Sequence, residues 1–75
     1  MEESNIRLIY PPTLVNLPVI YQLIRKYDLA VNILRAHITP EHGWIEVQLS
    51  GDSPVIAEAL TWLRDLGIDV RPISQ

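Results

Sequence analysis

Cysteine is absent from this chain of 75 residues, and glycine occurs only three times. Disulfide bonds and thiolate metal sites are therefore excluded. No glycine belongs to a phosphate-binding loop of the form G-x-x-x-x-G-K-[ST]. A single domain of this size hides only about 60% of the surface that its unfolded chain exposes, so the core is marginal. Because small domains without disulfides or metals commonly gain stability by self-association, we expect a homodimer.

Basic residues are also few, at six Lys and Arg against nine Asp and Glu, which gives a formal net charge of −3 at pH 7. Nucleic-acid binding draws much of its affinity from Lys and Arg that displace counterions, and the basic residues here form no stripe. The N-terminus lacks the basic region of a signal peptide, and Asn16 and Pro18 interrupt the longest apolar stretch. We expect a cytoplasmic protein that neither binds nucleic acid nor inserts into a membrane.

The hydrophobic pattern that is present alternates between a period of two and a period of about 3.6 residues. Strands are predicted over residues 5–10, 31–39, 44–50 and 68–73, and helices over residues 17–27 and 54–66. Asn16 and Ser53 are expected to cap the two helices, because each is followed closely by a proline that suits a first helical turn. Gly67 is expected to end the second helix.

The resulting order, βαββαβ, predicts the α+β class and a ferredoxin-like sandwich formed by one domain over residues 1–75. Its four-stranded antiparallel sheet has the order 4-1-3-2, with two helices on one face. The last strand is then an edge, which suits Pro72 because proline lacks a backbone donor. The side chains predicted to lie between sheet and helices are Leu8, Leu23, Leu34, Val47, Leu49, Leu60 and Leu63.

Groups that could perform catalysis or bind a metal are sparse. His37 and His42 lie near Glu41 and Glu46, but a metal site needs several ligands in fixed geometry, and we expect both histidines to be exposed. No serine has an evident base beside it. The carboxylates, Glu46 among them, are expected to be solvated rather than desolvated for acid or base catalysis. We therefore predict no metal, no cofactor and no enzymatic activity.

Charged and large apolar side chains mix on the sheet face that points away from the predicted helices. Alternation places there Arg7, Ile9, Ile33, Arg35, His37, Trp44, Glu46, Gln48, Arg71 and Ile73. Such a face is either an ordinary solvated side of an antiparallel sheet, with Arg stems covering apolar surface, or a partner surface. Exposed aromatic residues flanked by Arg are enriched at interfaces, so the candidate interaction surface is Arg35, His37 and Trp44.

Three segments in a specific order carry a resemblance to a known family. They are Pro18-Val19-Ile20, Val31-Asn32-Ile33-Leu34, and Ala59-Leu60-Thr61-Trp62-Leu63 with the following Gly67-Ile68-Asp69-Val70. The chain resembles the NIL domain family over nearly its whole length. The resemblance implies a regulatory module that pairs with a copy of itself and holds methionine near the interface, with Asn32 as a ligand contact. The neighbouring Ile33 and Leu34 offer apolar contact for a thioether, so the expected ligand-binding residues are Asn32, Ile33 and Leu34.

Asn32 has two interpretations. An Asn near a strand start often satisfies local backbone groups, but its amide also offers the donor and the acceptor that an amino acid's carboxylate and ammonium require. The segment Arg35-Ala36-His37 is bulkier and more charged than a small ligand pocket needs.

Two functions stay open. The first is a non-enzymatic regulatory domain that binds a small amino acid, methionine, at or near a self-association interface. The alternative is a protein–protein interaction module that docks on a transporter or on an enzyme of sulfur or methionine metabolism without binding a small molecule.

Overall fold

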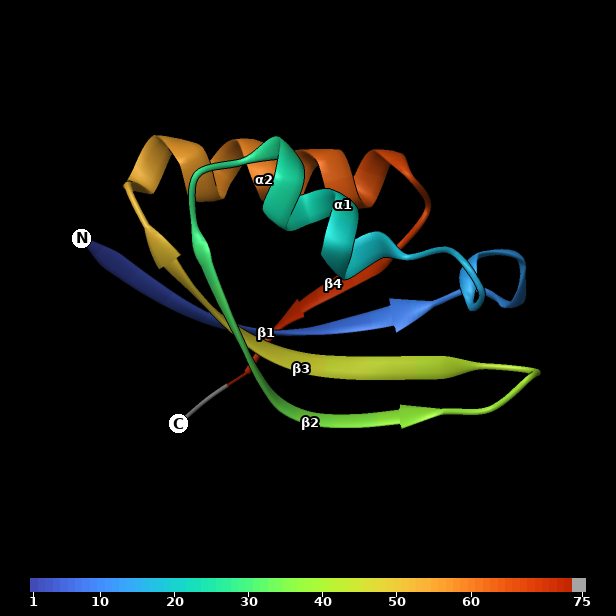
Figure 1. Cartoon of the computed structure of the whole chain (residues 1–75). Coiled ribbons are helices and arrows are strands. Elements are labelled where there is room, and N and C mark those ends of the chain that lie inside the picture. The colour runs from blue at the N-terminus through green and yellow to red at the C-terminus, as the bar shows by residue number, and fades with distance from the viewer. Residues whose placement is uncertain (74–75) are drawn as a thin grey trace.

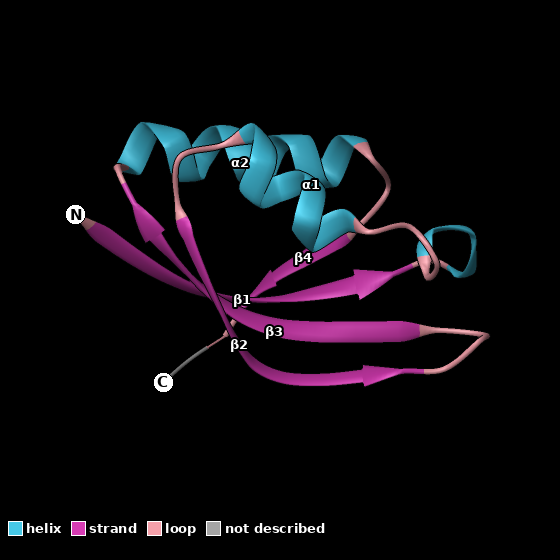
Figure 2. Ribbon diagram, in the orientation of Figure 1, coloured by secondary structure: helices cyan, strands magenta, loops and turns pink. Residues whose placement is uncertain are grey.

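The protein is described from a computed structural model, which places residues 1–73; the last two residues of the predicted domain lie outside that range. The elements are β1 (Glu2–Tyr10), the 3-10 helix η1 (Pro12–Leu14), α1 (Val19–Lys26), β2 (Ala30–Ile38), β3 (Gly43–Gly51), α2 (Ser53–Asp65) and β4 (Asp69–Pro72). The strands form one antiparallel sheet in the order β2-β3-β1-β4. Both helices cover one face of this sheet (Figures 1 and 2), so the predicted fold and strand order are confirmed.

The core lies between the helices and the two central strands, β1 and β3. Alternate residues of these strands point towards the helices and are buried, as the two-residue period requires. Five of the side chains predicted for the core are fully buried: Leu8, Leu23, Val47, Leu49 and Leu63. Leu60 was also predicted to be buried, but it packs at the margin of this core and is only partly buried.

The prediction that Leu34 belongs to the core is wrong, because its side chain is 41% exposed. The cause is a β-bulge in β2. Ile33 pairs with Val47 and Arg35 pairs with the next residue, Glu46, which leaves Leu34 as the extra residue between them. Because paired residues point to the same side of a sheet, Ile33 lies on the helix side, whereas alternation alone placed it on the opposite face.

The helix starts also differ from those predicted. Pro18 has φ −77° and ψ 67°, which is not helical, so α1 begins only at Val19 and Asn16 does not cap it. In α2 the N-cap position belongs to Asp52, without a side-chain cap hydrogen bond, and Ser53 is the first helical residue. Gly67 follows α2 with φ 102°, the left-handed conformation predicted for its role in ending the helix. Within the described residues no helix has the length and apolar character that a membrane crossing needs.

Candidate functional site

The strand β2 is the least covered element of the sheet. Eight of its nine residues are exposed and only Val31 is partly buried. The helix α1 is about 12 Å long, against about 30 Å for the strand. Ile33 and Ile38 therefore remain 54% and 55% exposed on the helix side, where α1 exposes Tyr21 and Ile24. These apolar side chains lie along the outer edge of β2, which pairs with no other strand of the described chain.

The predicted ligand residues lie in this strand but do not converge within one copy of the chain. Asn32 pairs with Gln48 and points to the face without helices, Ile33 pairs with Val47 and points to the helix side, and Leu34 occupies the bulge. A cleft of about 360 Å³ lies where the loop before β2 meets the end of β3, but Asn32 does not line it. A ligand held by Asn32 therefore needs further walls from outside this set of residues.

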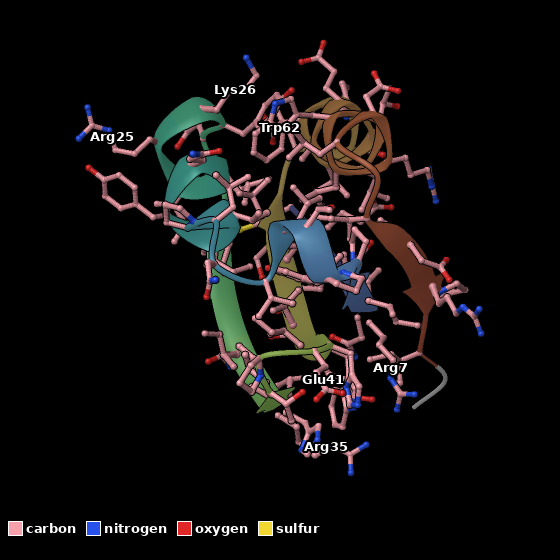
Figure 3. All side chains as sticks on the ribbon, turned by 90° about the vertical axis from the view of Figure 1, so that its right-hand side faces the viewer. Arg7, Arg25, Lys26, Arg35, Glu41 and Trp62 are labelled. Carbon is pink, nitrogen blue, oxygen red and sulfur yellow. The ribbon has the colours of Figure 1, made fainter. Side chains whose placement is uncertain are left out.

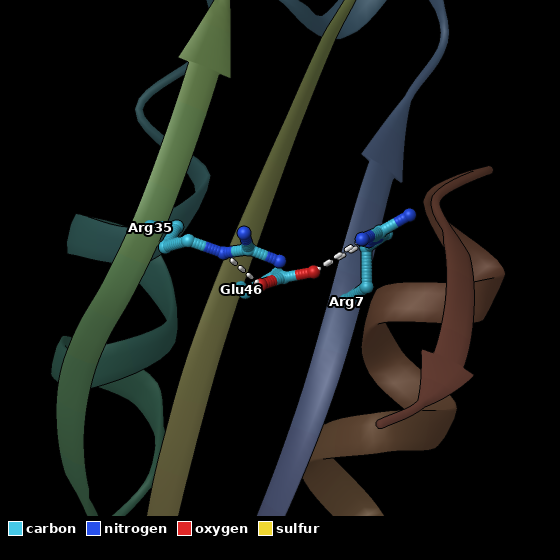
Figure 4. Close-up of polar contacts among 3 residues, drawn as sticks. All are labelled: Arg7, Arg35 and Glu46. Carbon is cyan, nitrogen blue, oxygen red and sulfur yellow. Dashed lines mark hydrogen bonds and ion pairs between the residues drawn. The ribbon is translucent and has the colours of Figure 1, made fainter. Parts of the chain in front are cut away.

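A charged cluster occupies the middle of the sheet face without helices, and Glu46 on β3 is its centre. Glu46 is only 3% exposed, because long Arg side chains from both neighbouring strands cover it. Arg7 on β1 donates from Nε to Glu46 Oε2 at 2.8 Å and also pairs with that oxygen through Nη2. Arg35 on β2 donates from Nε to Oε1 at 2.7 Å (Figure 4). The prediction that Glu46 is solvated is wrong.

The electrostatics of this cluster keep it ionised. Hydrogen bonds from Arg35 and then Arg7 lower the pKa of Glu46, in opposition to desolvation, which raises it. Glu46 in turn raises the pKa of Arg35. A carboxylate with a lowered pKa is a poor general acid, so the cluster is suited to holding two guanidinium groups in place rather than to moving protons.

Trp44 lies beside the two guanidinium groups. Arg7 Cζ is 4.8 Å and Arg35 Cζ is 5.8 Å from the centroid of the Trp44 ring, within cation–π range. His37 stacks on Trp44 with ring centroids 6.0 Å apart, and His42 stacks on His37 at 5.9 Å. The predicted interaction surface of Arg35, His37 and Trp44 is thus one contiguous group on the sheet.

Arg7 and Glu46 complete this group and were not predicted as site residues. Their alternation placed both on this face, but only the register of β1 against β3, which pairs Arg7 with Glu46, makes them partners. Arg7 and Arg35 lie at the far end of the molecule from Trp62 and Lys26, which mark the helices (Figure 3). We call the surface formed by Arg7, Arg35, His37, Trp44 and Glu46 the Trp44 face.

Comparison with known proteins places this fold and these segments in a family. The sequence matches the NIL domain over residues 4–72. It is 37% identical over 73 residues to an uncharacterized protein of Synechococcus elongatus, covering 93% of this chain and 90% of that protein. It is 33% identical over 73 residues to the methionine import ATP-binding protein MetN 1 of Paraburkholderia xenovorans, covering 92% of this chain but only 21% of the ATPase.

Among solved structures, the C-terminal domain of an ABC transporter ATP-binding protein from Enterococcus faecalis superposes with a TM-score of 0.83 at 25% identity. The match covers 96% of this chain and 84% of that domain. This chain spans about a fifth of the length of the methionine import ATPases that it matches. The chain belongs to the NIL domain family and is homologous to the C-terminal domain of those ATPases.

Proposed function

We propose that this chain is a non-enzymatic regulatory domain that binds methionine at an interface between two copies of itself. The observation that carries the proposal is the uncovered β2 strand, which combines an unpaired edge, exposed apolar side chains and the Asn-Ile-Leu segment. The homologous domain belongs to proteins named for methionine import, which supports methionine as the ligand. Their ATP-binding role supports a cytoplasmic location.

Pairing of two β2 strands is the simplest way to cover this region. Antiparallel pairing about a twofold axis would satisfy the free backbone groups of both edges and join the two sheets. The same arrangement would bring Ile33 and Ile38 of each copy towards apolar surface of the other. For a domain with a marginal core, burying these side chains adds stability that the monomer lacks.

Asn32 is the residue proposed to recognise the amino acid. Its exposed amide can accept a hydrogen bond from the ammonium group and donate one to the carboxylate. Ile33 and Leu34 offer apolar contact for a thioether side chain. Because Asn32 and Ile33 point to opposite faces of the strand, a second copy has to supply the remaining walls of the site. Ligand binding and self-association are therefore coupled in this proposal.

Replacement of Asn32 tests the binding site directly. Asn32→Ala removes the polar contacts and is expected to weaken methionine binding by about 1–3 kcal/mol, or roughly 5- to 150-fold. Two-dimensional NMR titration should show shift changes at residues 31–36 in the natural sequence that are lost in this variant. Asn16→Ala, at another exposed asparagine far from β2 in sequence, serves as the matched control and should bind normally. Absence of any shift at millimolar methionine would refute the proposed ligand.

A second candidate function is favoured by the Trp44 face. There Trp44 is half-buried between two Arg side chains, an arrangement enriched at protein interfaces. In this role the chain docks on a transporter or on an enzyme of sulfur or methionine metabolism and needs no small molecule. Failure of methionine to perturb residues 31–36, together with an intact fold, would place this function first.

A further inference from the structure

We infer that the Trp44 face, extended to Arg71 on β4, binds a partner segment that carries two carboxylate side chains. This inference rests on the docking role proposed above as the second candidate and adds the chemistry of the partner. It does not depend on methionine binding at Asn32. Its basis is a row of four charged residues across the whole sheet, in the order Arg35, Glu46, Arg7 and Arg71.

The row has an excess of positive charge. It holds three guanidinium groups and one carboxylate, and even with Asp69, which pairs with Arg71 at 2.9 Å, the group carries +1 in a chain of net charge −3. Arg7 and Arg71 lie directly opposite each other on β1 and β4. Like charges at directly opposed positions destabilise a sheet, and an anion placed between them reverses that effect.

All three guanidinium groups have a carboxylate partner within the chain, Glu46 for Arg7 and Arg35 and Asp69 for Arg71. Glu46 accepts hydrogen bonds from Nε and Nη2 of Arg7 and from Nε of Arg35. Nη1 of Arg7 and both Nη atoms of Arg35 have no acceptor within residues 1–73. In Figure 4 the outermost nitrogen of Arg7 points away from Glu46. The free Nη pair of Arg35 matches a carboxylate in geometry and charge, and the free Nη1 of Arg7 can donate to a second one. Because their rotamers are already restricted, less entropy is lost on binding.

The surface also has room for the carboxylates. A cleft of about 260 Å³ lies between Arg7 and Arg71 and is bounded by Pro72 and Ile73, which can contact the apolar stem of a Glu side chain. Arg35 lies three strand spacings from Arg71, or about 14 Å. An extended segment covers that distance in about four residues. The partner segment is therefore expected to carry acidic residues about four positions apart, and its middle residues would pass beside Trp44, which lies in the neighbouring row of the sheet.

The test uses a pentapeptide with glutamate at both ends, three central serines, and blocked termini. NMR should show shifts of the Trp44 indole and of the Nε–H groups of Arg7 and Arg35, and binding should weaken as salt is added. The peptide with glutamine in place of glutamate should cause no change. Equal shifts with the glutamine peptide, or with inorganic phosphate at the same concentration, would overturn the inference.

Variants separate this surface from the methionine site. Arg71→Gln should weaken binding of the glutamate peptide about 10-fold. Arg64→Gln, which removes an exposed Arg from α2, should leave peptide binding unchanged. Neither variant should alter the response of residues 31–36 to methionine, so the failure of one proposal is distinguishable from the failure of the other. Unchanged peptide binding in Arg71→Gln would contradict the inference.

Glu46→Gln tests whether the fixed positions of Arg7 and Arg35 contribute to binding of the glutamate peptide. The substitution raises the net positive charge of the face, so attraction by charge alone would strengthen binding of the glutamate peptide. Loss of the carboxylate that fixes Arg7 and Arg35 should weaken it instead, and should also shift the Nε–H resonances of both Arg residues in the free protein. Stronger or unchanged binding would show that Glu46 is not a positioning residue.

Discussion

Glu46 shows how a single buried carboxylate organises one face of this domain. A charge on a central strand is costly to bury unless it is paired, and here two Arg side chains from separate strands supply the pairing. Removing the carboxylate leaves Arg7 and Arg35 near each other without a counter-charge. The cluster therefore couples the stability of the sheet to the arrangement of its exposed guanidinium groups.

Acid titration should reveal this contribution. The pKa of Glu46 is lowered in the folded state by Arg35 and Arg7, whereas the unfolded value is about 4.3. The stabilisation is therefore present above about pH 4.3 and is lost as the pH falls through the lower folded value. Urea denaturation at several pH values should show a smaller loss of stability below pH 4 for Glu46→Gln than for the natural sequence. The same acid dependence in both proteins would contradict this assignment.

Part of this residue-level arrangement was predictable from the sequence. Two-residue alternation placed Arg35, His37 and Trp44 on one face, and the structure confirms that placement. The burial of Glu46 was not predictable, because it depends on which residues of β1 and β2 lie opposite it. That register is a long-range property that local composition does not encode.

At the scale of elements, the local pattern of β2 predicts a strand but does not predict which face each of its residues occupies. Its apolar and β-branched residues predicted a strand, and the expected topology predicted an edge. The bulge at Leu34 arises only from pairing with β3, so alternation assigned Leu34 to the core and Ile33 to the wrong face. The short α1 adds to the exposure of this strand, and its late start at Val19 follows from the conformation of Pro18.

The packing of α2 against the sheet can be tested by comparing Leu63 and Leu60. Leu63 is fully buried, so Leu63→Ala should lower the free energy of unfolding by about 2–5 kcal/mol. Leu60 is only partly buried, so Leu60→Ala should lower it by less. Because both changes remove the same atoms from the same helix, intrinsic helix propensity cancels in the comparison. Urea denaturation followed by circular dichroism measures both values. An equal or larger loss for Leu60→Ala would contradict the packing described for α2.

At the scale of the whole molecule, the sheet offers two adjacent surfaces that share the strand β2. The edge of β2 has unpaired backbone groups and apolar side chains, whereas the Trp44 face has fixed guanidinium groups and an aromatic ring. An edge can pair with a second copy while the face stays open.

The overall fold could be predicted from the sequence more completely than either surface. Hydrophobic periodicity, prolines near helix starts and Gly67 after α2 are local features, and together they specify βαββαβ. The resemblance carried by three short segments led to the same family as the full comparisons. Site geometry depends on register, on a bulge and on helix length, which are properties of the assembled sheet.

Sedimentation equilibrium with and without methionine tests the central proposal most directly, because ligand binding and self-association are there one coupled process. We predict a dimer at micromolar concentrations and a shift towards dimer when methionine is added. Ile33→Lys places a charge on the exposed edge strand and should shift the equilibrium towards monomer. Ala57→Lys, at an exposed position of α2, should leave the equilibrium unchanged. A clean monomer at high micromolar concentration, unchanged by methionine, would contradict the account.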